Sequence, residues 1–354
     1  MSVANLPIFS LQRPPAGAAV AAASVAVDAS KDARPDDCSG RLRTALDFRH
    51  AGRQIVDVAY ECVGPAHAPL VVICGGISAH RHVSAHAGNH GAGWWDAQVG
   101  PGRAVDTDAV RVLAIDWVGG DGRFDHAIDC SDQADAIAAV VHALGVGHVT
   151  ALVGASYGAM VGLHFAARHG QLLGHLVAIS GAHRAHAHAS ASRALQRSIV
   201  RSASGGLDNA LSLARQLAML GYRTPEEFAE RFSEAPRLID GRVHCASEAY
   251  LGHCGERFSR GTTATAYLRL SESVDLHAID PATVRVPTTL VAVAEDRLVP
   301  SADIHALAQG LGARRVIHHV SSRFGHDAFL ADPALMERIL RDALADAGGP
   351  RHGH

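Results

Sequence analysis

The sequence has no excess of positive charge and no long apolar run. Its 32 Lys and Arg residues are balanced by 35 Asp and Glu residues, which gives a formal net charge of −3. This balance provides no basic surface of the kind that attracts nucleic acids or anionic membranes. No stretch approaches the roughly 18 consecutive apolar residues that a membrane span requires. We therefore expect neither a nucleic acid nor a membrane as a partner.

The sequence also lacks paired cysteine motifs. Its six cysteines are scattered without Cys-x-x-Cys spacing, which in a chain of this length is typical of reduced thiols and favours the cytoplasm. The alanine-rich segment 16–27 follows Arg13-Pro14-Pro15 and lacks the leucine-rich centre of a secretory signal. We expect residues 1–40 to form a loose N-terminal arm.

The 24 histidines raise the question of a metal site. The candidate clusters are the segment 183–190 and the neighbouring pairs His244-Cys245 and His253-Cys254. Structural zinc sites usually combine two closely spaced ligand pairs, and neither cluster has that pattern. The sequence therefore predicts no metal and no tightly held cofactor.

Short apolar, β-rich runs alternate with helical patterns, and 48% of the residues are hydrophobic, which is enough for a sizeable core. Nearly continuous apolar strands separated by helices indicate a parallel sheet that is covered on both faces. The sequence thus predicts an α/β fold. The expected strands are 69–76, 110–116, 148–154, 175–180, 288–296 and 314–320.

Helical patterns connect these strands and, in one place, replace them. Before the strand at 148–154, Ser131 is suited to be the N-cap of a crossover helix and Gly145 to end it. From about residue 183 to 280 the strand signal fades and helical periodicity dominates. We expect core segments at 41–182 and 281–354, interrupted by a helical lid at 183–280.

The segment Gly154-Ala155-Ser156-Tyr157-Gly158 lies between an expected strand and an expected helix. This Gly-x-Ser-x-Gly pattern in a strand–turn–helix context is typical of a nucleophile elbow, in which a strained turn exposes the serine hydroxyl. The two glycines let the helix and the strand approach closely. The alternative is a plain glycine-rich turn.

A serine nucleophile needs a histidine base and an acid that orients the base, in the chain order Ser, Asp, His for this kind of elbow. Asp296 follows the strand at 288–296, and His326 follows the last expected strand. Glu295 competes for the role of the acid. We expect Ser156, Asp296 and His326 to form the catalytic triad.

The negative oxygen that forms during acyl transfer needs preorganised hydrogen-bond donors. One expected donor is the backbone N–H of Tyr157, directly after the nucleophile. The other should come from the loop that follows the strand at 69–76, where we favour Ile77 and keep Gly76 as the alternative.

With these residues the sequence resembles the homoserine O-acetyltransferase family of α/β-hydrolase-fold acyltransferases, which includes succinyl-transferring and serine-using relatives. The resemblance runs from about residue 45 to 345. Its most diagnostic stretch contains Gly93-Trp94-Trp95-Asp96, Gly100-Pro101-Gly102 and Asp106-Thr107. The segments "LARQLAMLGYRTPEEFAERF" and "GHDAFL" resemble the lid helix and the histidine motif of the family.

The resemblance implies an α/β-hydrolase fold and a serine acyl-enzyme that takes an acetyl or succinyl group from acyl-CoA and passes it to homoserine, for methionine biosynthesis. It also implies a homodimer. Arg215 and Tyr222 match the positions at which the family binds the amino-acid acceptor, and Asp327 matches the position that binds its ammonium group; the resemblance implies the same roles here. This agrees with the chemistry, since an α-amino acid needs both a cation and an anion.

The donor and the acceptor remain open at this stage. Succinyl-using members often carry an Arg two residues after the catalytic acid, whereas here that position is Leu298 and Arg297 lies one residue earlier. The elbow also has Ala and Tyr where the family usually has Gly and Met. A serine acyltransferase, a hydrolase with the same triad and a binding protein on the same fold are the alternatives.

Overall fold

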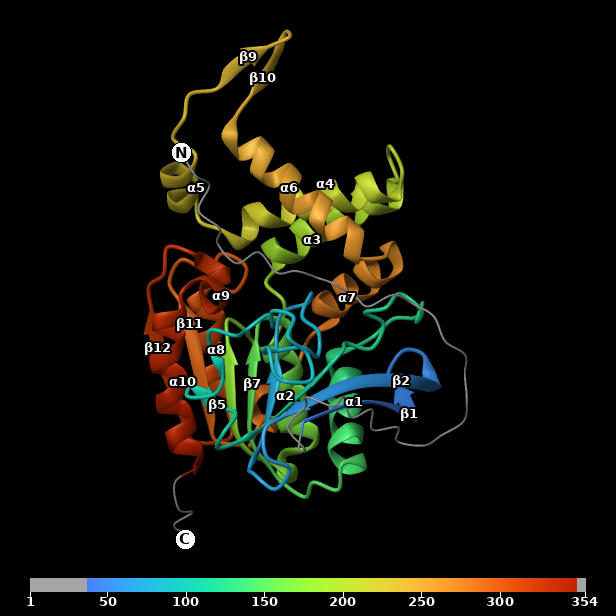
Figure 1. The fold of residues 1–354 in the computed structure, drawn as a ribbon, viewed down its shortest axis with the longest axis vertical. Coiled ribbons are helices and arrows are strands. Elements are labelled where there is room, and N and C mark those ends of the chain that lie inside the picture. Colours follow the sequence, from blue (N-terminus) through green and yellow to red (C-terminus); the bar gives the residue numbers. More distant parts are fainter. Residues whose placement is uncertain (1–36, 349–354) are drawn as a thin grey trace.

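The computed structural model describes residues 37–348, and an eight-stranded sheet forms its centre (Figure 1). The order across the sheet is β1-β2-β6-β3-β7-β8-β11-β12, and every pairing from β6 to β12 is parallel. The six strands expected from the sequence are all in this sheet. Its strands are β1 (Cys38–Phe48), β2 (Gly52–Val63), β3 (Leu70–Cys74), β6 (Arg111–Ile115), β7 (Val149–Ala155), β8 (Leu173–Ile179), β11 (Thr288–Val293) and β12 (Arg315–Val320).

The antiparallel pair β1–β2 was not among the expected strands. Its register joins Cys38 to Cys62 and Phe48 to Gly52. Strand β1 begins inside the segment 1–40 that the sequence assigned to a loose arm, and residues 1–36 of that segment lie outside the described part. Half-buried and exposed residues alternate along β1, so a search for continuous apolar runs does not detect it.

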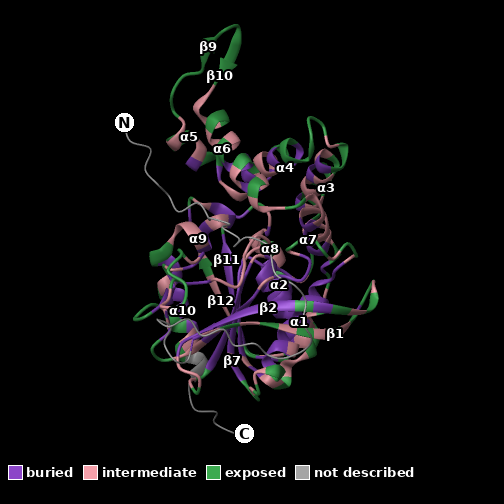
Figure 2. Ribbon diagram, turned by 45° about the vertical axis from the view of Figure 1, so that its right-hand side comes forward, coloured by how far each residue is buried: buried purple, intermediate pink, exposed green. Residues whose placement is uncertain are grey.

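Helices cover both faces of the sheet. Along β3, Leu70, Val72 and Cys74 pack into one core cluster, while Val71 and Ile73 pack into the other, because successive side chains of a strand point to opposite faces. The first cluster includes α1 (Cys130–Ala143), α2 (Tyr157–Arg168) and α8 (Ser301–Gly310); the second includes α10 (Pro333–Gly348). The sheet is therefore buried on both sides, as expected (Figure 2).

The cap of α1 differs from the expectation. The N-cap is Asp129, whose side chain accepts from the Ser131 N–H, while the Asp132 side chain accepts from the Asp129 N–H. This reciprocal pair is a capping box, and the assignment of Ser131 as the N-cap was wrong. At the other end, Gly145 has a φ of 70°, which suits the residue after a helix.

The insertion after β8 forms a helical layer beyond the carboxyl ends of the parallel strands (Figure 1). At its tip, the β9–β10 hairpin is exposed (Figure 2). Within residues 37–348, no helix is long and apolar enough to cross a membrane. The insertion contains α3 (Ala187–Ser202), α4 (Leu207–Tyr222), α5 (Pro225–Arg231), β9 (Arg237–Ile239), β10 (Arg242–His244), α6 (Ala246–Gly261) and α7 (Ala264–Leu276).

The remaining elements are short. They are β4 (Val99–Gly100), β5 (Val105–Asp106), the 3₁₀ turns η1 (Gly170–Leu172), η2 (Pro281–Thr283) and η3 (Gly325–Asp327), and the helix α9 (Ala328–Ala331).

Candidate active site

Ser156 occupies the sharp turn between β7 and α2. Its backbone has φ 55° and ψ −117°, a conformation that is strained for any residue other than glycine and that clusters at functional sites. The neighbouring glycines make the turn possible. A Cβ on Gly158 would overlap the Cys74 carbonyl oxygen, and one on Gly154 would overlap the Gly158 carbonyl oxygen. The strand, the turn and the helix therefore pack as the elbow pattern predicts.

Three side chains distant in the sequence meet at this turn. His326, on η3, has its Nε2 atom 2.8 Å from Ser156 Oγ and its Nδ1 atom 2.7 Å from Asp296 Oδ2. Asp296 lies just after β11, and its other oxygen accepts from the Leu298 and Val299 N–H groups at 2.9 and 3.0 Å. These backbone bonds fix the carboxylate, which in turn fixes the imidazole, as in a Ser-His-Asp triad.

Glu295, the competing acid, has other hydrogen-bond partners than His326. Its carboxylate accepts from the Ser321 hydroxyl and from the Ser322 N–H at 2.8 Å. It therefore holds the loop after β12 in place. The geometry favours Asp296 as the partner of His326.

The environment of His326 controls its protonation. Burial lowers the pKa of His326, but the negative charge of Asp296 and its hydrogen bond outweigh this, so that the pKa is raised above its ordinary value of 6.5. A more basic imidazole is better suited to take the proton of a serine hydroxyl.

The loop after β3 supports the choice of Ile77 as an oxyanion donor. The Gly76 carbonyl accepts from Trp117 Nε1 at 3.0 Å and from the Ala79 N–H at 2.9 Å. Because C=O and N–H point in opposite directions across a trans peptide, the Ile77 N–H points away from Trp117. Ile77 and Ser156 line the same cavity. For the alternative donor Gly76, the preceding Gly75 carbonyl faces the elbow and accepts from the Gly158 N–H, so the Gly76 N–H points away from the elbow.

The second expected donor, the Tyr157 N–H, lies in the first turn of α2. The N–H groups of a first turn have no partner within the helix and are available to an anion. The oxyanion roles of Ile77 and Tyr157 remain predictions that agree with this geometry.

The motif Gly93-Trp94-Trp95-Asp96 connects two loops of the site through hydrogen bonds. Asp96 accepts from the Gly93 and Ala85 N–H groups, and Trp95 donates from Nε1 to the Phe329 carbonyl at 2.8 Å. Phe329 lies three residues after His326. The motif thus links the loop after β3 to the loop that carries the base.

The proposed acceptor residues of the lid lie over the triad. Tyr222, the last residue of α4, stacks on the His326 ring at a centroid distance of 5.9 Å. The Arg215 guanidinium lies 5.1 Å from the centroids of both Tyr222 and Phe258. Arg215, Tyr222 and Asp327 all line the cavity that contains Ser156.

Asp327 has a partner that the sequence did not suggest. Its Oδ2 atom lies 2.8 Å from Nε of Arg223, and Arg223 also lies 3.1 Å from Glu227. Burial lowers the pKa of Arg223, but these two carboxylates outweigh it and raise the pKa, so the side chain remains a cation. An acceptor ammonium at Asp327 would therefore share the carboxylate with Arg223. No sequence signal joins residues 104 positions apart; only the fold brings them together.

Arg297 and Leu298, the candidates for donor selection, directly follow Asp296 in the chain. Arg297 is exposed and Leu298 packs against the main core cluster. Neither is among the residues that line the cavity with Ser156 or the larger cavity beneath the lid. The structure therefore does not bring these two side chains to the acyl site.

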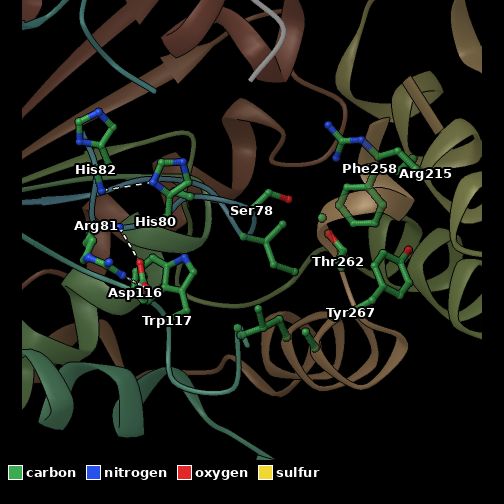
Figure 3. A pocket seen from close by; sticks show the side chains of 18 of the residues that line it. Ser78, His80, Arg81, His82, Asp116, Trp117, Arg215, Phe258, Thr262 and Tyr267 are labelled. Carbon is green, nitrogen blue, oxygen red and sulfur yellow. Dashed lines mark hydrogen bonds and ion pairs between the residues drawn. The ribbon is translucent and has the colours of Figure 1, made fainter. Parts of the chain in front are cut away.

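Two cavities, of about 140 and 460 Å³, adjoin each other and share Ile77, Arg215 and Tyr222 in their walls. The smaller contains Ser156 and His326, and the larger extends beneath the lid. Figure 3 shows His80, His82 and Arg81 of the core at one end of the larger cavity and Arg215, Phe258 and Tyr267 of the lid at the other. Two adjoining spaces of unequal size suit a long donor and a small acceptor.

Comparison with known proteins gives these features a family. Residues 69–333 match the family model described as the alpha/beta hydrolase fold. The chain is 52% identical over 318 residues to a homoserine O-succinyltransferase of Xanthomonas campestris pv. campestris, which covers 89% of this chain and 86% of that protein. The chain belongs to the homoserine O-acyltransferase family. This confirms the resemblance, the fold class and the expectation of an acyltransferase enzyme.

Other relatives of this acyltransferase differ in their named substrates. A serine O-succinyltransferase of Xanthomonas campestris pv. campestris (strain B100) is 31% identical over 353 residues and covers 82% of this chain and 92% of its own. The crystal structure of a homoserine O-acetyltransferase from Bacillus anthracis has a TM-score of 0.76 at 18% identity, covering 86% of this chain and 97% of that one. That structure shows the same fold.

Proposed function

We propose that this acyltransferase moves a succinyl group from succinyl-CoA to the hydroxyl of homoserine through an acyl-Ser156 intermediate. The observation that carries the proposal is the hydrogen-bonded chain from Ser156 through His326 to Asp296, set in a cavity that is also lined by Arg215 and Asp327. A hydrolytic triad alone does not require an arginine and an aspartate at the acceptor position.

In the acylation step, His326 Nε2 takes the proton of Ser156 Oγ as the oxygen attacks the thioester carbonyl. The tetrahedral oxyanion accepts hydrogen bonds from the Ile77 and Tyr157 N–H groups. Collapse of this intermediate breaks the C–S bond, and His326 returns the proton to the leaving thiolate. The products are CoA and succinyl-Ser156.

In the transfer step, His326 takes the proton of the acceptor hydroxyl, whose oxygen attacks the acyl carbonyl. The ester bond to Ser156 then breaks, and His326 reprotonates the serine. Arg215 binds the acceptor carboxylate and Asp327 its ammonium group, which places the hydroxyl near His326. Water must be excluded meanwhile, and the lid helices above the cavity provide the cover.

The succinyl donor is proposed from the relative that is 52% identical and named for that donor. A succinyl group ends in a carboxylate that needs a cation. Three arginines on the wall of the larger cavity, Arg81, Arg193 and Arg215, are the candidate cations for this carboxylate. Two of them already have an acidic partner, since Arg81 is paired with Asp116 and Arg193 with Asp275.

A serine acceptor is the second candidate, favoured by the serine O-succinyltransferase at 31% identity. Serine is one methylene shorter than homoserine, so its hydroxyl would reach less far from Arg215 and Asp327 toward His326. A single methylene is worth only about 1–3 kcal/mol of discrimination. The preference must therefore be measured directly.

The test is mass spectrometry of the purified chain after incubation with succinyl-CoA or with acetyl-CoA, followed by a chase with homoserine or serine. We expect a mass increase of one succinyl group on the wild type and none on Ser156→Ala. Homoserine should discharge the adduct faster than serine or water does. In Arg215→Met the adduct should form but its discharge by homoserine should need about 10- to 100-fold more acceptor, since a charged hydrogen-bonding partner is lost.

Three outcomes would overturn parts of the proposal. An acetyl adduct in place of the succinyl one would change the donor, and discharge by serine alone would change the acceptor. Rapid CoA release without any acceptor, dependent on Ser156, would indicate a hydrolase. Neither adduct nor CoA release would indicate a binding protein on this fold.

We further propose that the enzyme works in the cytoplasm as a homodimer, in methionine biosynthesis. The described cysteines are all free thiols, which suits a reducing compartment. Leu207, Leu213 and Leu220 of α4 are 53%, 41% and 51% exposed, and a partner lid could cover them. Light scattering after size exclusion would detect the dimer, and charged substitutions at these leucines should convert it to a monomer.

A further inference from the structure

A cluster of two imidazoles and one carboxylate lies on the far side of the larger cavity from Arg215. Glu61 of β2 and His82 and His86 of the loop after β3 have ligand atoms that all lie within 4.8 Å of one another. Glu61 Oε1 is 2.9 Å from His82 Nδ1 and 3.1 Å from His86 Nε2. The three side chains are 5–11% exposed. The cluster is outside the triad and has no part in the acyl transfer described above.

The hydrogen bonds of His82 orient its Nδ1 atom toward Glu61. Nε2 lies 2.7 Å from the Gly91 carbonyl oxygen, which can only accept, so Nε2 carries a hydrogen. In the neutral ring Nδ1 then carries the lone pair, which faces the carboxylate of Glu61 at 2.9 Å and the side-chain amide of Asn89 at 3.0 Å. Two electron-rich atoms at 2.9 Å repel each other unless a proton or a metal cation lies between them.

His86 approaches the same Glu61 oxygen through its Nε2 atom. Its buried Nε2 atom lies 3.1 Å from Glu61 Oε1, and its Nδ1 atom is 3.4 Å from the buried Asp37 Oδ2. The Gly88 N–H donates to Nδ1 at 3.1 Å, so without a metal ion the ring hydrogen lies on Nε2 and points toward Glu61. A metal ion bound at Nε2 would replace this hydrogen, and Nδ1 would then carry it toward Asp37 Oδ2 once the Gly88 N–H turns aside. A carboxylate behind a ligating histidine is a common second partner in metal sites.

We propose that Glu61, His82 and His86 bind a divalent transition metal ion of the zinc class. Imidazole nitrogens and a carboxylate oxygen are ligands that such ions use, often with a fourth position open to water. Bonds of about 2.0–2.1 Å in a tetrahedral site place neighbouring ligands roughly 3.4 Å apart. The two distances to Glu61 are a few tenths of an ångström shorter, so a small outward movement admits the ion.

The metal has a structural consequence that follows from chain connectivity. His82 and His86 belong to the same loop as Ile77, and Glu61 belongs to a strand at the centre of the β1–β2–β6 region. A bound ion would fasten this loop to the sheet. The expectation from the sequence was no metal, because the histidine clusters at 183–190 and near residues 244 and 253 lack paired ligands; this site uses different residues.

The test is a titration of the untagged, EDTA-treated full chain with Co²⁺, followed by visible absorption, and with Zn²⁺ by calorimetry. We expect one ion per chain, a visible Co²⁺ band that Zn²⁺ removes, and a rise in Tm with Zn²⁺. His82→Gln and His86→Gln should each weaken binding at least about 100-fold. Asp37→Asn should weaken it about 10-fold, as for a second-layer partner.

The matched control is His305→Gln. His305 and His319 form an exposed pair of stacked imidazoles with their Nε2 atoms 3.3 Å apart, so they report binding by surface histidines. This variant should keep the Co²⁺ band and the Tm rise. Circular dichroism without metal checks that each variant folds, and His86→Gln is compared with His82→Gln in case one does not.

Two results would overturn the proposal. In the first, the wild type shows no stoichiometric Co²⁺ band and no Tm rise, which would identify the cluster as an ion pair between Glu61 and a doubly protonated His82. In the second, binding persists in both His82→Gln and His86→Gln but is lost in His305→Gln, which would identify surface histidines as the ligands.

Discussion

Replacing Asp296 with Asn should abolish catalysis while leaving the fold intact. In the structure, Asp296 Oδ1 accepts from the Leu298 and Val299 N–H groups, and Oδ2 accepts from His326 Nδ1. An asparagine that keeps its carbonyl oxygen toward the two backbone N–H groups must turn its NH₂ group toward His326. That group can only donate, so Nδ1 becomes the acceptor and the ring hydrogen moves to Nε2.

The size of the effect follows from the atom that now faces the nucleophile. Ser156 Oγ lies 2.8 Å from His326 Nε2, and an Nε2 that already carries a hydrogen cannot take the serine proton. The wrong tautomer in a triad of this kind lowers kcat by ~10⁴-fold, which corresponds to ~5.4 kcal/mol in activation free energy. The free energy of unfolding should change by only about 1 kcal/mol, because the substitution is isosteric and both backbone hydrogen bonds remain.

The assay is single-turnover release of CoA from succinyl-CoA, with acyl-enzyme formation followed by mass spectrometry. Glu295→Gln is the matched control, since Glu295 is adjacent in sequence but bonds to Ser321 and Ser322. It should keep the acylation rate within about threefold of the wild type. Urea unfolding of both variants separates a chemical defect from a folding defect.

Two results would refute the reasoning. An Asp296→Asn variant that acylates within tenfold of the wild-type rate would show that the carboxylate does not set the tautomer of His326. If Glu295→Gln lost as much acylation as Asp296→Asn, with both variants folded, the assignment of Asp296 as the acid of the triad would be wrong.

Two predictions concern pH. Because His326 must be neutral to accept the serine proton and its pKa is raised above 6.5, kcat/KM for the acyl donor should rise with pH through an apparent pKa above 6.5; a midpoint below 6.5 would contradict this. Burial lowers the pKa of His164 to about 4 and that of His277 to about 3, so stability should be full above pH 6.5 and fall below it as the unfolded chain takes up protons. The loss at pH 5 should be about 2–4 kcal/mol for the pair, and urea unfolding that is equally stable at pH 5 and pH 8 would oppose it.

The sequence predicted the features that local patterns encode. The six parallel strands are apolar runs, and the elbow is a five-residue motif whose glycines are required by contacts with Cys74 and with each other. The histidine and the acid follow the last two strands, where a parallel sheet gathers its carboxyl ends. Chain order therefore indicated Asp296 and His326, although only coordinates distinguish Asp296 from its neighbour Glu295.

The sequence could not predict features that depend on distant partners. Arg223 meets Asp327 because the end of the lid helix packs on the loop of the base, and nothing in either segment shows this. His82 and His86 are four residues apart but lie in a loop, and their third partner, Glu61, is on β2. The prediction of the α1 N-cap was wrong for a more local reason. The side chains of Asp129 and Asp132 each accept a hydrogen bond from the backbone N–H of the other, and the helix therefore begins before Ser131.

The lid is joined to the core directly at the loop that carries His326. Tyr222 stacks on His326, Arg223 pairs with Asp327, and the Thr224 hydroxyl donates to the Arg323 carbonyl at 2.5 Å. Three successive residues of the insertion thus contact the segment 323–327, which carries the base. The position of the imidazole therefore depends on the lid as well as on Asp296. Since Arg215, the proposed acceptor-binding residue, lies on the same helix as Tyr222, a movement of α4 should change acceptor binding and the geometry of His326 together.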